Sequence, residues 1–274
     1  MNTKVIDFHT HIFPDKLAPK AIAALEHSGG VKAATQGTKE SLKRSMMQGG
    51  VDFSLNLPIA SRPDQVQSIN QFAIALNQEG LSLREQGGGI LSFGAIHPLY
   101  EDWKQELRRL QSAGIKGIKL HPDFQGFFLD DEPMVAVMEE AASLGLMILI
   151  HCGMDVSFPD IHRSTPERLH RILPRLQGAT IIAAHLGGYR YLDDVERLLV
   201  GSDVYIDTSF TIGQFDEGQI KRILQNHRPD HILFGTDSPW EDQGKAVAAL
   251  RALGLPASLE QAILWENGAK LLGL

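Results

Sequence analysis

The sequence predicts an α/β protein in which residues 1–274 form one domain, a (β/α)8 TIM barrel with its functional site at the C-terminal ends of the strands. Eight short apolar runs are typical of strands, and each is followed by a segment with helical spacing. Runs such as Ile148, Leu149 and Ile150 are apolar on both faces, as parallel strands covered by helices require. No composition shift marks a domain boundary. A doubly wound open sheet is the alternative, disfavoured because no Gly-x-Gly-x-x-Gly turn follows the first run.

The first half of the chain alternates between the two patterns. Residues 5–11 begin as an apolar strand, and residues 14–27 have helical spacing that Gly29 and Gly30 end. Residues 38–47 predict a second helix, and the alternating residues 51–57 predict a strand that stops at Pro58. Further along, the patterns predict helices over residues 64–79 and 101–112 and strands over residues 90–98 and 115–121.

The second half repeats the alternation without interruption. Its predicted helices span residues 132–144, 166–176, 193–200 and 217–226. Its predicted strands span residues 146–151, 179–185, 204–207 and 231–237. Two or three helices are expected to close the chain between residues 245 and 272.

Composition excludes several classes of function. Lys and Arg number 26 against 33 Asp and Glu, a net charge of −7, which argues against nucleic-acid binding. The sequence has no apolar run of membrane-spanning length and no signal-peptide pattern, so we expect a cytoplasmic protein that does not bind membranes. A single cysteine, Cys152, rules out an internal disulfide and is expected to be a buried small hydrophobe. The expected partner is a small-molecule substrate, and a homodimer is compatible with the sequence.

Histidines gather where the strands are predicted to end. Six of the eleven occupy such positions, and the last strand ends in an aspartate: His9, His11, His97, His121, His151, His185 and Asp237. Because the C-terminal ends of barrel strands share one mouth, we expect these side chains to converge. A metal or acid–base site explains the set better than separate histidines hydrogen-bonded at the rim.

Ligand chemistry selects within this set. A catalytic divalent ion needs a few nitrogen and oxygen ligands and an open position for water. His9, His11 and His151 offer neutral nitrogens, and Asp237 offers an anionic oxygen. This mixture suits one Zn²⁺ ion, with Mn²⁺ or Fe²⁺ as alternatives, and would activate water near neutral pH. His185, one strand along from His151, is the candidate base for that water.

The motifs at these strand ends resemble those of the amidohydrolase superfamily, in particular its amidohydrolase-related branch, which contains metal-dependent hydrolases and decarboxylases. The resemblance covers nearly the whole chain and rests on five pieces in the family's order: Ile6-Asp7-Phe8-His9-Thr10-His11, Gly117-Ile118-Lys119-Leu120-His121-Pro122, His151-Cys152-Gly153, Ala184-His185-Leu186-Gly187-Gly188 and Gly235-Thr236-Asp237-Ser238-Pro239. It implies a TIM barrel in which His9, His11, His151 and Asp237 bind the metal. It also implies that His185 activates water or handles a proton.

The resemblance allows two interpretations of Lys119. In binuclear members a lysine on strand four is carboxylated and bridges two metals. Here His121 follows Lys119 by two residues, a pattern more typical of the mononuclear branch. We therefore expect an unmodified cation that binds a substrate carboxylate or polarises a carbonyl. A structural salt bridge at the rim is the remaining alternative.

Five further residues are weaker candidates for contact with the substrate. His121 and His97 either contact substrate or support the ligands from behind. Arg190 lies on a loop after strand six, where a guanidinium could take a carboxylate in bidentate fashion. Asp155 and Arg163 lie on the preceding loop, where specificity usually resides.

Three functions compete. The leading hypothesis is hydrolysis of an amide, ester or lactone in a small, carboxylate-bearing substrate, with Asp237 and His185 moving the proton and Lys119 holding the substrate. The alternative is non-oxidative decarboxylation of an unsaturated or aromatic acid with the same ligands. A non-catalytic barrel that binds a small acid is the third, and it gives His185 no role.

Overall fold

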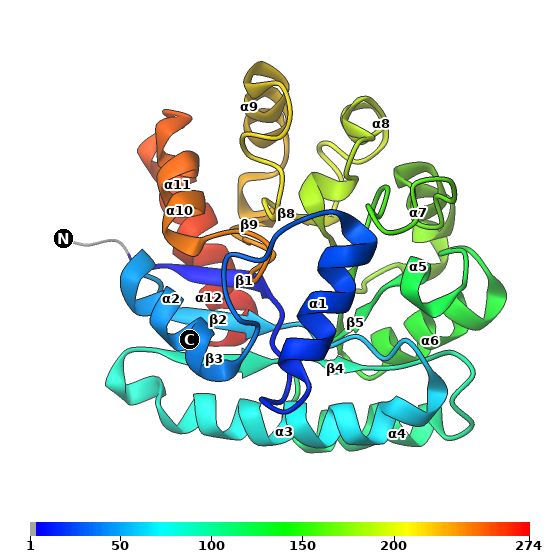
Figure 1. The fold of residues 1–274 in the computed structure, drawn as a ribbon. Coiled ribbons are helices and arrows are strands. Elements are labelled where there is room, and N and C mark those ends of the chain that lie inside the picture. The colour runs from blue at the N-terminus through cyan, green and yellow to red at the C-terminus, as the bar shows by residue number, and fades with distance from the viewer. Residues whose placement is uncertain (1–3) are drawn as a thin grey trace.

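The computed structural model describes residues 4–274, and its strands form a parallel barrel surrounded by helices (Figure 1). The strands are β1 (Ile6–Thr10), β2 (Phe53–Asn56), β3 (Gly89–Ser92), β4 (Gly94–Ala95), β5 (Gly117–Leu120), β6 (Met147–Ile150), β7 (Ile181–Ala183), β8 (Tyr205–Asp207) and β9 (Ile232–Leu233). The predicted TIM-barrel fold is confirmed.

The barrel consists of two parallel sheets joined at both seams. One sheet has the order β1-β2-β3 and the other runs from β4 to β9 in sequence order. At the first seam the chain passes from β3 to β4 through Phe93, whose N–H donates to the Asn56 carbonyl at 3.0 Å. At the second seam the Phe8 N–H donates to the Phe234 carbonyl at 2.8 Å, and Thr10 forms a parallel bridge with Ser238.

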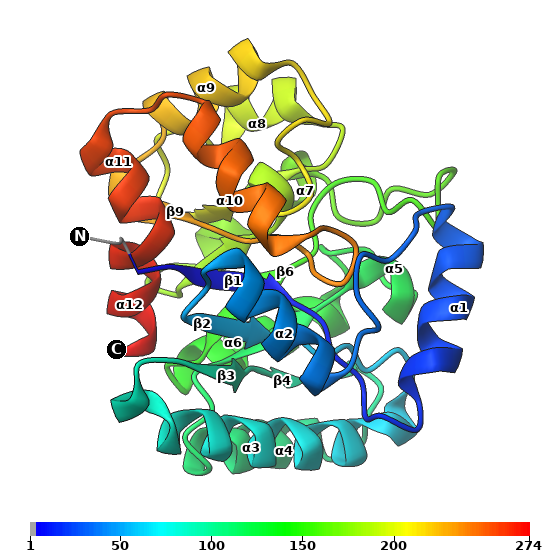
Figure 2. The ribbon, with the colours of Figure 1, turned by 60° about the vertical axis from the view of Figure 1, so that its left-hand side comes forward.

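The longer helices pack around the strands (Figure 2). They are α1 (Ala18–Gly29), α2 (Lys39–Gly49), α3 (Val66–Ser82), α4 (Trp103–Ser112), α6 (Glu132–Ser143), α7 (Pro166–Ile172), α8 (Leu192–Leu198), α9 (Glu217–Asn226), α10 (Gln243–Ala252), α11 (Ala257–Gln261) and α12 (Asn267–Leu272), with the short α5 (Pro122–Gln125) after β5. Helix α2 begins at a capping box, in which the Thr38 hydroxyl accepts from the Ser41 N–H and the Ser41 hydroxyl accepts from the Thr38 N–H. Helix α1 stands apart on the side toward which β1 points.

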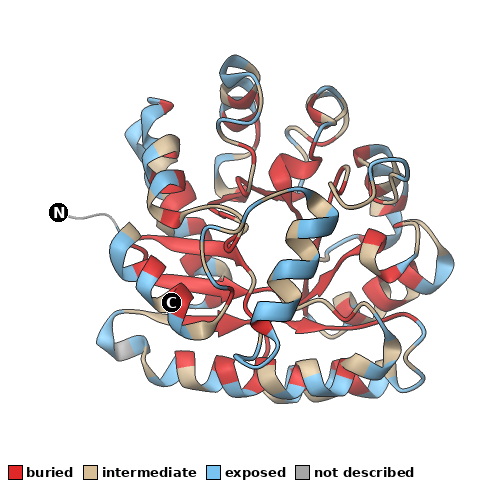
Figure 3. Cartoon of the chain, in the orientation of Figure 1, coloured by how far each residue is buried: buried red, intermediate tan, exposed pale blue. Residues whose placement is uncertain are grey.

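Burial follows this layering, with buried strands inside and helices exposed on their outer faces (Figure 3). One apolar cluster lies between the strands and the helices and includes Ile118 and Ile148. A second cluster includes Phe8 and Leu149, and Phe8 meets Phe93 edge to face at 6.0 Å between ring centres. Cys152 is fully buried, as expected.

All eight predicted strands differ from the observed bounds, six of them by one or two residues at an end and two by more. The predicted strand over residues 90–98 is two segments, β3 and β4, because the chain changes neighbours at Phe93 and then leaves the sheet. The predicted strands over residues 179–185 and 231–237 are shorter, and their last residues turn out of the sheet. Within residues 4–274, no helix has both the length and the apolar character needed to cross a membrane.

Candidate metal centre

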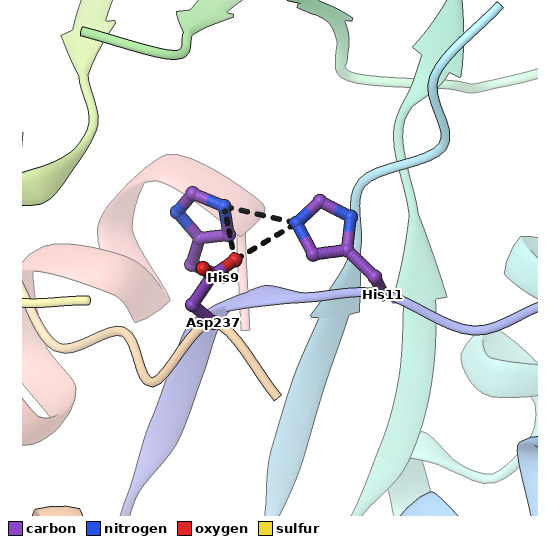
Figure 4. A group of neighbouring side chains, drawn as sticks. All are labelled: His9, His11 and Asp237. Carbon is purple, nitrogen blue, oxygen red and sulfur yellow. Dashed lines mark hydrogen bonds and ion pairs between the residues drawn. The ribbon is translucent and has the colours of Figure 1, made fainter. Parts of the chain in front are cut away.

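Three of the predicted ligands meet at the C-terminal end of β1 (Figure 4). The Nε2 atoms of His9 and His11 are 3.2 Å apart. Asp237 Oδ1 lies 3.3 Å from the first and 3.0 Å from the second. Ligand atoms at about 2.1 Å around one tetrahedral ion would be about 3.4 Å apart. The three atoms are therefore spaced as ligands of one ion would be.

The hydrogen bond on the side of each imidazole ring away from the centre determines which ring nitrogen carries the proton. His11 Nδ1 lies 2.7 Å from the Leu57 carbonyl oxygen, which can only accept, so the proton is on Nδ1. His9 Nδ1 likewise donates to Asp207 Oδ2 at 2.8 Å. Both Nε2 atoms therefore present lone pairs toward the Asp237 carboxylate. Three acceptors aimed at one point fit a bound cation.

Lys119 lies beside this group. Its Nζ is 3.3 Å from His9 Nε2, and its side chain is almost completely buried. Burial lowers the pKa of Lys119 to about 8. Burial, together with the charge of Lys119, also lowers the pKa of His9 to about 3, so the imidazole is neutral at pH 7. The ammonium therefore belongs to the centre itself, and no carboxylate forms a rim salt bridge with it among the described residues.

The fourth predicted ligand, His151, lies in a neighbouring group with His121 and Asp155. Asp155 Oδ2 is 3.3 Å from His121 Nε2 and 3.9 Å from His151 Nε2. The two imidazoles stack with ring centres 4.1 Å apart. Burial lowers the pKa of both histidines well below the usual value, so both are neutral.

Hydrogen bonds leave one nitrogen of His151 free. His185 Nδ1 lies 3.0 Å from the Ser209 carbonyl oxygen, to which it donates, so His185 Nε2 is an acceptor. His151 Nδ1 donates to that Nε2 at 3.0 Å. His151 Nε2 is then a buried lone pair without a hydrogen-bond partner among the described residues. Such an atom fits a metal ligand, and the centre of the His185 ring lies 5.2 Å from that of His9 and 4.8 Å from that of His151.

Asp207 and Ser209 hold His9 and His185 in place through hydrogen bonds. The Asp207 carboxylate accepts from His9 Nδ1, from the His185 N–H at 2.9 Å and from the Ser209 hydroxyl. Burial alone would raise the pKa of Asp207, but its interaction with His9, which includes the hydrogen bond from Nδ1, holds that pKa below the usual range. Sequence reasoning missed both residues. Asp207 ends a predicted strand, so the rule that selected the histidines could have found it.

The backbone at the mouth is shaped to bring these groups together. A bulge shifts the pairing of β1 with β2 between Asp7 and Thr10, next to His9. Gly235 passes so close that an added Cβ would lie 2.8 Å from His9 Cβ. His185 and Asp237 have φ angles of 59° and 64°, a region that L-residues adopt at a cost of about 1 kcal/mol or more. Their surroundings therefore hold both side chains in place.

A buried carboxyl ties β1 to the segment that carries Asp237. Asp7 accepts from the Thr236 hydroxyl at 2.6 Å, from the Thr236 N–H at 3.0 Å and from Gln243 Nε2 at 2.7 Å. Burial outweighs these bonds and raises the pKa of Asp7 to about 7. The contact fixes the separation between His9 and Asp237.

One cavity, open to solvent at its mouth, contains the centre. Its lining includes seven of the predicted site residues: His9, His11, Lys119, His121, His151, His185 and Asp237. Helices α1 and α5 and the loops supply apolar walls, with side chains that include Leu25, Phe124, Phe210 and Trp240. The predicted convergence at the strand ends is therefore found for these seven residues.

Two predicted substrate-binding residues lie outside the cavity lining. His97 is buried next to Phe127, and its Nδ1 accepts from the Leu99 N–H at 3.2 Å. It is turned away because the chain leaves the sheet after β4. Arg190 is exposed, with its guanidinium over the Tyr189 ring at 5.9 Å. The structure therefore gives neither residue a contact with a ligand in the cavity, whereas Asp155 does line it.

Several solved structures share this fold over almost their whole length. An uncharacterised TIM-barrel protein from Bordetella bronchiseptica has a TM-score of 0.74 at 16% identity, covering 98% of both chains. A 5-carboxyvanillate decarboxylase from Novosphingobium aromaticivorans, complexed with manganese and a nitrobenzoic acid, has a TM-score of 0.72 at 15% identity, covering 100% of this chain and 97% of the other. A proposed 2-pyrone-4,6-dicarboxylic acid hydrolase from Pseudomonas putida has a TM-score of 0.65 at 16% identity, covering 100% and 98%.

At these identities the solved structures establish the fold alone, and a search of curated proteins finds no match. The family model described as amidohydrolase matches residues 6–274, which include every residue of the centre. The expected resemblance is confirmed: the chain belongs to the amidohydrolase family.

Proposed function

We propose that the protein is a metal-dependent hydrolase that cleaves an amide, ester or lactone bond in a small substrate. The observation that carries this is the convergence of two imidazole lone pairs and one carboxylate oxygen at the floor of an open cavity. His9, His11, Asp237 and His151 would hold one divalent ion. The nitrogen-rich donor set suits Zn²⁺, with Mn²⁺ and Fe²⁺ as alternatives. When bound, the ion supplies an electrophile and makes water more acidic.

Lys119 and His185 have different tasks in this proposal. Lys119 Nζ lies 3.3 Å from His9 Nε2, so it faces the group that reacts rather than a distant part of the substrate. Its ammonium donates to a carbonyl oxygen and stabilises the charge that develops there. His185 Nε2, whose lone pair accepts from His151 Nδ1 in the structure, exchanges that partner for water and takes its proton, which passes to the leaving group through His185 or Asp237. The apolar walls limit competing water.

Decarboxylation is the second candidate because Lys119, the one lysine or arginine among the described residues that line the cavity, lies at its floor. A carboxylate bound there would itself be the reacting group, held by Lys119. One structural neighbour, the manganese-containing 5-carboxyvanillate decarboxylase, is named for this reaction. His185 would then deliver a proton to carbon instead of accepting one from water.

A panel assay separates these functions. The protein is loaded with Zn²⁺ or Mn²⁺ and tested against lactones, esters, amides and aromatic acids, with product and CO₂ both measured. The proposal expects metal-dependent hydrolysis of at least one class without CO₂ release. Metal-dependent CO₂ release from an acid, with no hydrolysis, would replace it with the second candidate. Turnover that persists after chelation would refute both.

A further inference from the structure

We propose that the cavity takes a substrate with a single polar end, so that the group that reacts is the only charged or strongly polar group and the rest of the molecule is apolar. This rests on the proposed function in that it assumes an ion at the floor. It departs from the sequence-based expectation of a substrate that carries a separate carboxylate.

The polar and apolar residues of the lining occupy different parts of the cavity. The imidazoles, Lys119 and Asp237 lie at the ends of strands or in the segments that follow them, and they form the floor. The apolar side chains come from α1, the short helix α5 and the loops, as with Leu25, Phe124 and Trp240. A substrate bound with its polar end on the floor therefore presents the rest of its surface to apolar walls.

Positive charge is confined to the floor. Lys119 is the one lysine or arginine among the described residues that line the cavity, and it lies 3.3 Å from His9 Nε2. The ion would lie in the same place. A single anionic or carbonyl group can reach both, whereas a second anionic group farther up the cavity would have no cation to pair with. Burying an unpaired charge against apolar side chains is strongly unfavourable.

Asp155 adds repulsion between the floor and the walls. Its Oδ1 accepts from the Ser157 N–H at 2.7 Å, which fixes the carboxylate in place. Its Oδ2 faces His121 Nε2 at 3.3 Å and lines the cavity. A second carboxylate on the substrate would meet this like charge and otherwise mostly apolar groups.

Three matched acids test the proposal by calorimetric binding to the metal-loaded protein. Benzoate has one carboxylate, isophthalate has two, and monomethyl isophthalate has the size of the second with the charge of the first. We expect benzoate and the monomethyl ester to bind with similar Kd and isophthalate to bind at least about 10-fold more weakly. Isophthalate binding as tightly as the ester would overturn the proposal. So would an ester as weak as isophthalate, or no binding of benzoate.

A charge placed on the apolar wall provides a second test. Leu25, half-buried on α1, faces the cavity, whereas Ala24 on the same helix is exposed. Leu25→Arg should reduce the ratio of the Kd of isophthalate to the Kd of its monomethyl ester by about 10-fold, because the new guanidinium can pair with the second carboxylate. Ala24→Arg, the matched control, should leave this ratio of Kd values unchanged. Equal effects of the two variants would contradict a local role for the wall.

The binding test addresses the single polar end and the turnover test addresses the proposed function, and either can fail without the other. If no substrate is hydrolysed but the three acids bind in the expected order, the single polar end is supported and the proposed function is wrong. If esters with a remote carboxylate are hydrolysed as efficiently as neutral ones, the proposed function is supported and the single polar end is wrong.

Discussion

Replacing Asp207 with asparagine removes the acceptor that sets the tautomer of His9. Asp207 Oδ2 accepts from His9 Nδ1 at 2.8 Å, and Oδ1 accepts from the His185 N–H at 2.9 Å and from Ser209. An asparagine keeps one oxygen, which can still accept from the His185 N–H and from Ser209, and its NH₂ group then faces His9. Two donors would then face each other, and moving the His9 proton to Nε2, the atom aimed at the ion, relieves this contact.

We therefore expect Asp207→Asn to weaken metal binding by about 10- to 100-fold, the usual effect of losing such a supporting carboxylate. This corresponds to about 1.4–2.7 kcal/mol. Competition with a chromophoric chelator measures the metal Kd of the variant and of wild type. Asp203→Asn, an exposed position before β8, is the control and should bind metal normally. An Asp207→Asn protein that is folded and binds metal as tightly as wild type would refute this role.

The remaining predictions concern the floor of the cavity and a buried carboxyl near it. His185→Asn should keep its metal and lose about two to four orders of magnitude in kcat, while His27→Asn, an exposed control, should not; loss of metal would make His185 a ligand instead. Lys119→Met should retain metal and Tm but lose about 2–4 kcal/mol in kcat/KM; a lower Tm with full activity would give the lysine a structural role. Burial and the nearby Asp155 charge raise the pKa of Asp123 from 3.8 to about 6. The folded protein therefore holds this proton more tightly than the unfolded chain, so the free energy of unfolding falls as the pH rises from about 4 to about 6. Asp123→Asn should therefore be more stable than wild type at pH 7 by about 1–3 kcal/mol and should lose this advantage near pH 4 in urea unfolding; the same difference at both pH values would contradict the assignment.

The sequence was sufficient to place most of the centre because parallel strands converge at one end. His9, His11, His121, His151 and His185 all end or follow apolar runs, so their meeting did not depend on exact boundaries. The fold followed from the same alternation of strands and helices.

What periodicity could not predict is where a strand stops and how the chain turns afterwards. His97 is two residues beyond β4, in a segment that has already left the sheet, so it does not reach the mouth. Asp237 reaches the centre from an irregular segment with positive φ, which no alternation pattern encodes. Asp207 acts through a hydrogen bond to His9 across 198 positions of sequence, and such pairings appear only once the barrel is closed.

The metal content of the purified protein tests the central claim most directly. Elemental analysis after reconstitution and removal of free ion should find about one divalent ion per chain in wild type. The His9→Ala, His11→Ala double variant, which loses two of the converging nitrogens, should hold none at the same concentrations. Two ions per wild-type chain, or a double variant that retains its ion, would contradict the mononuclear centre proposed here.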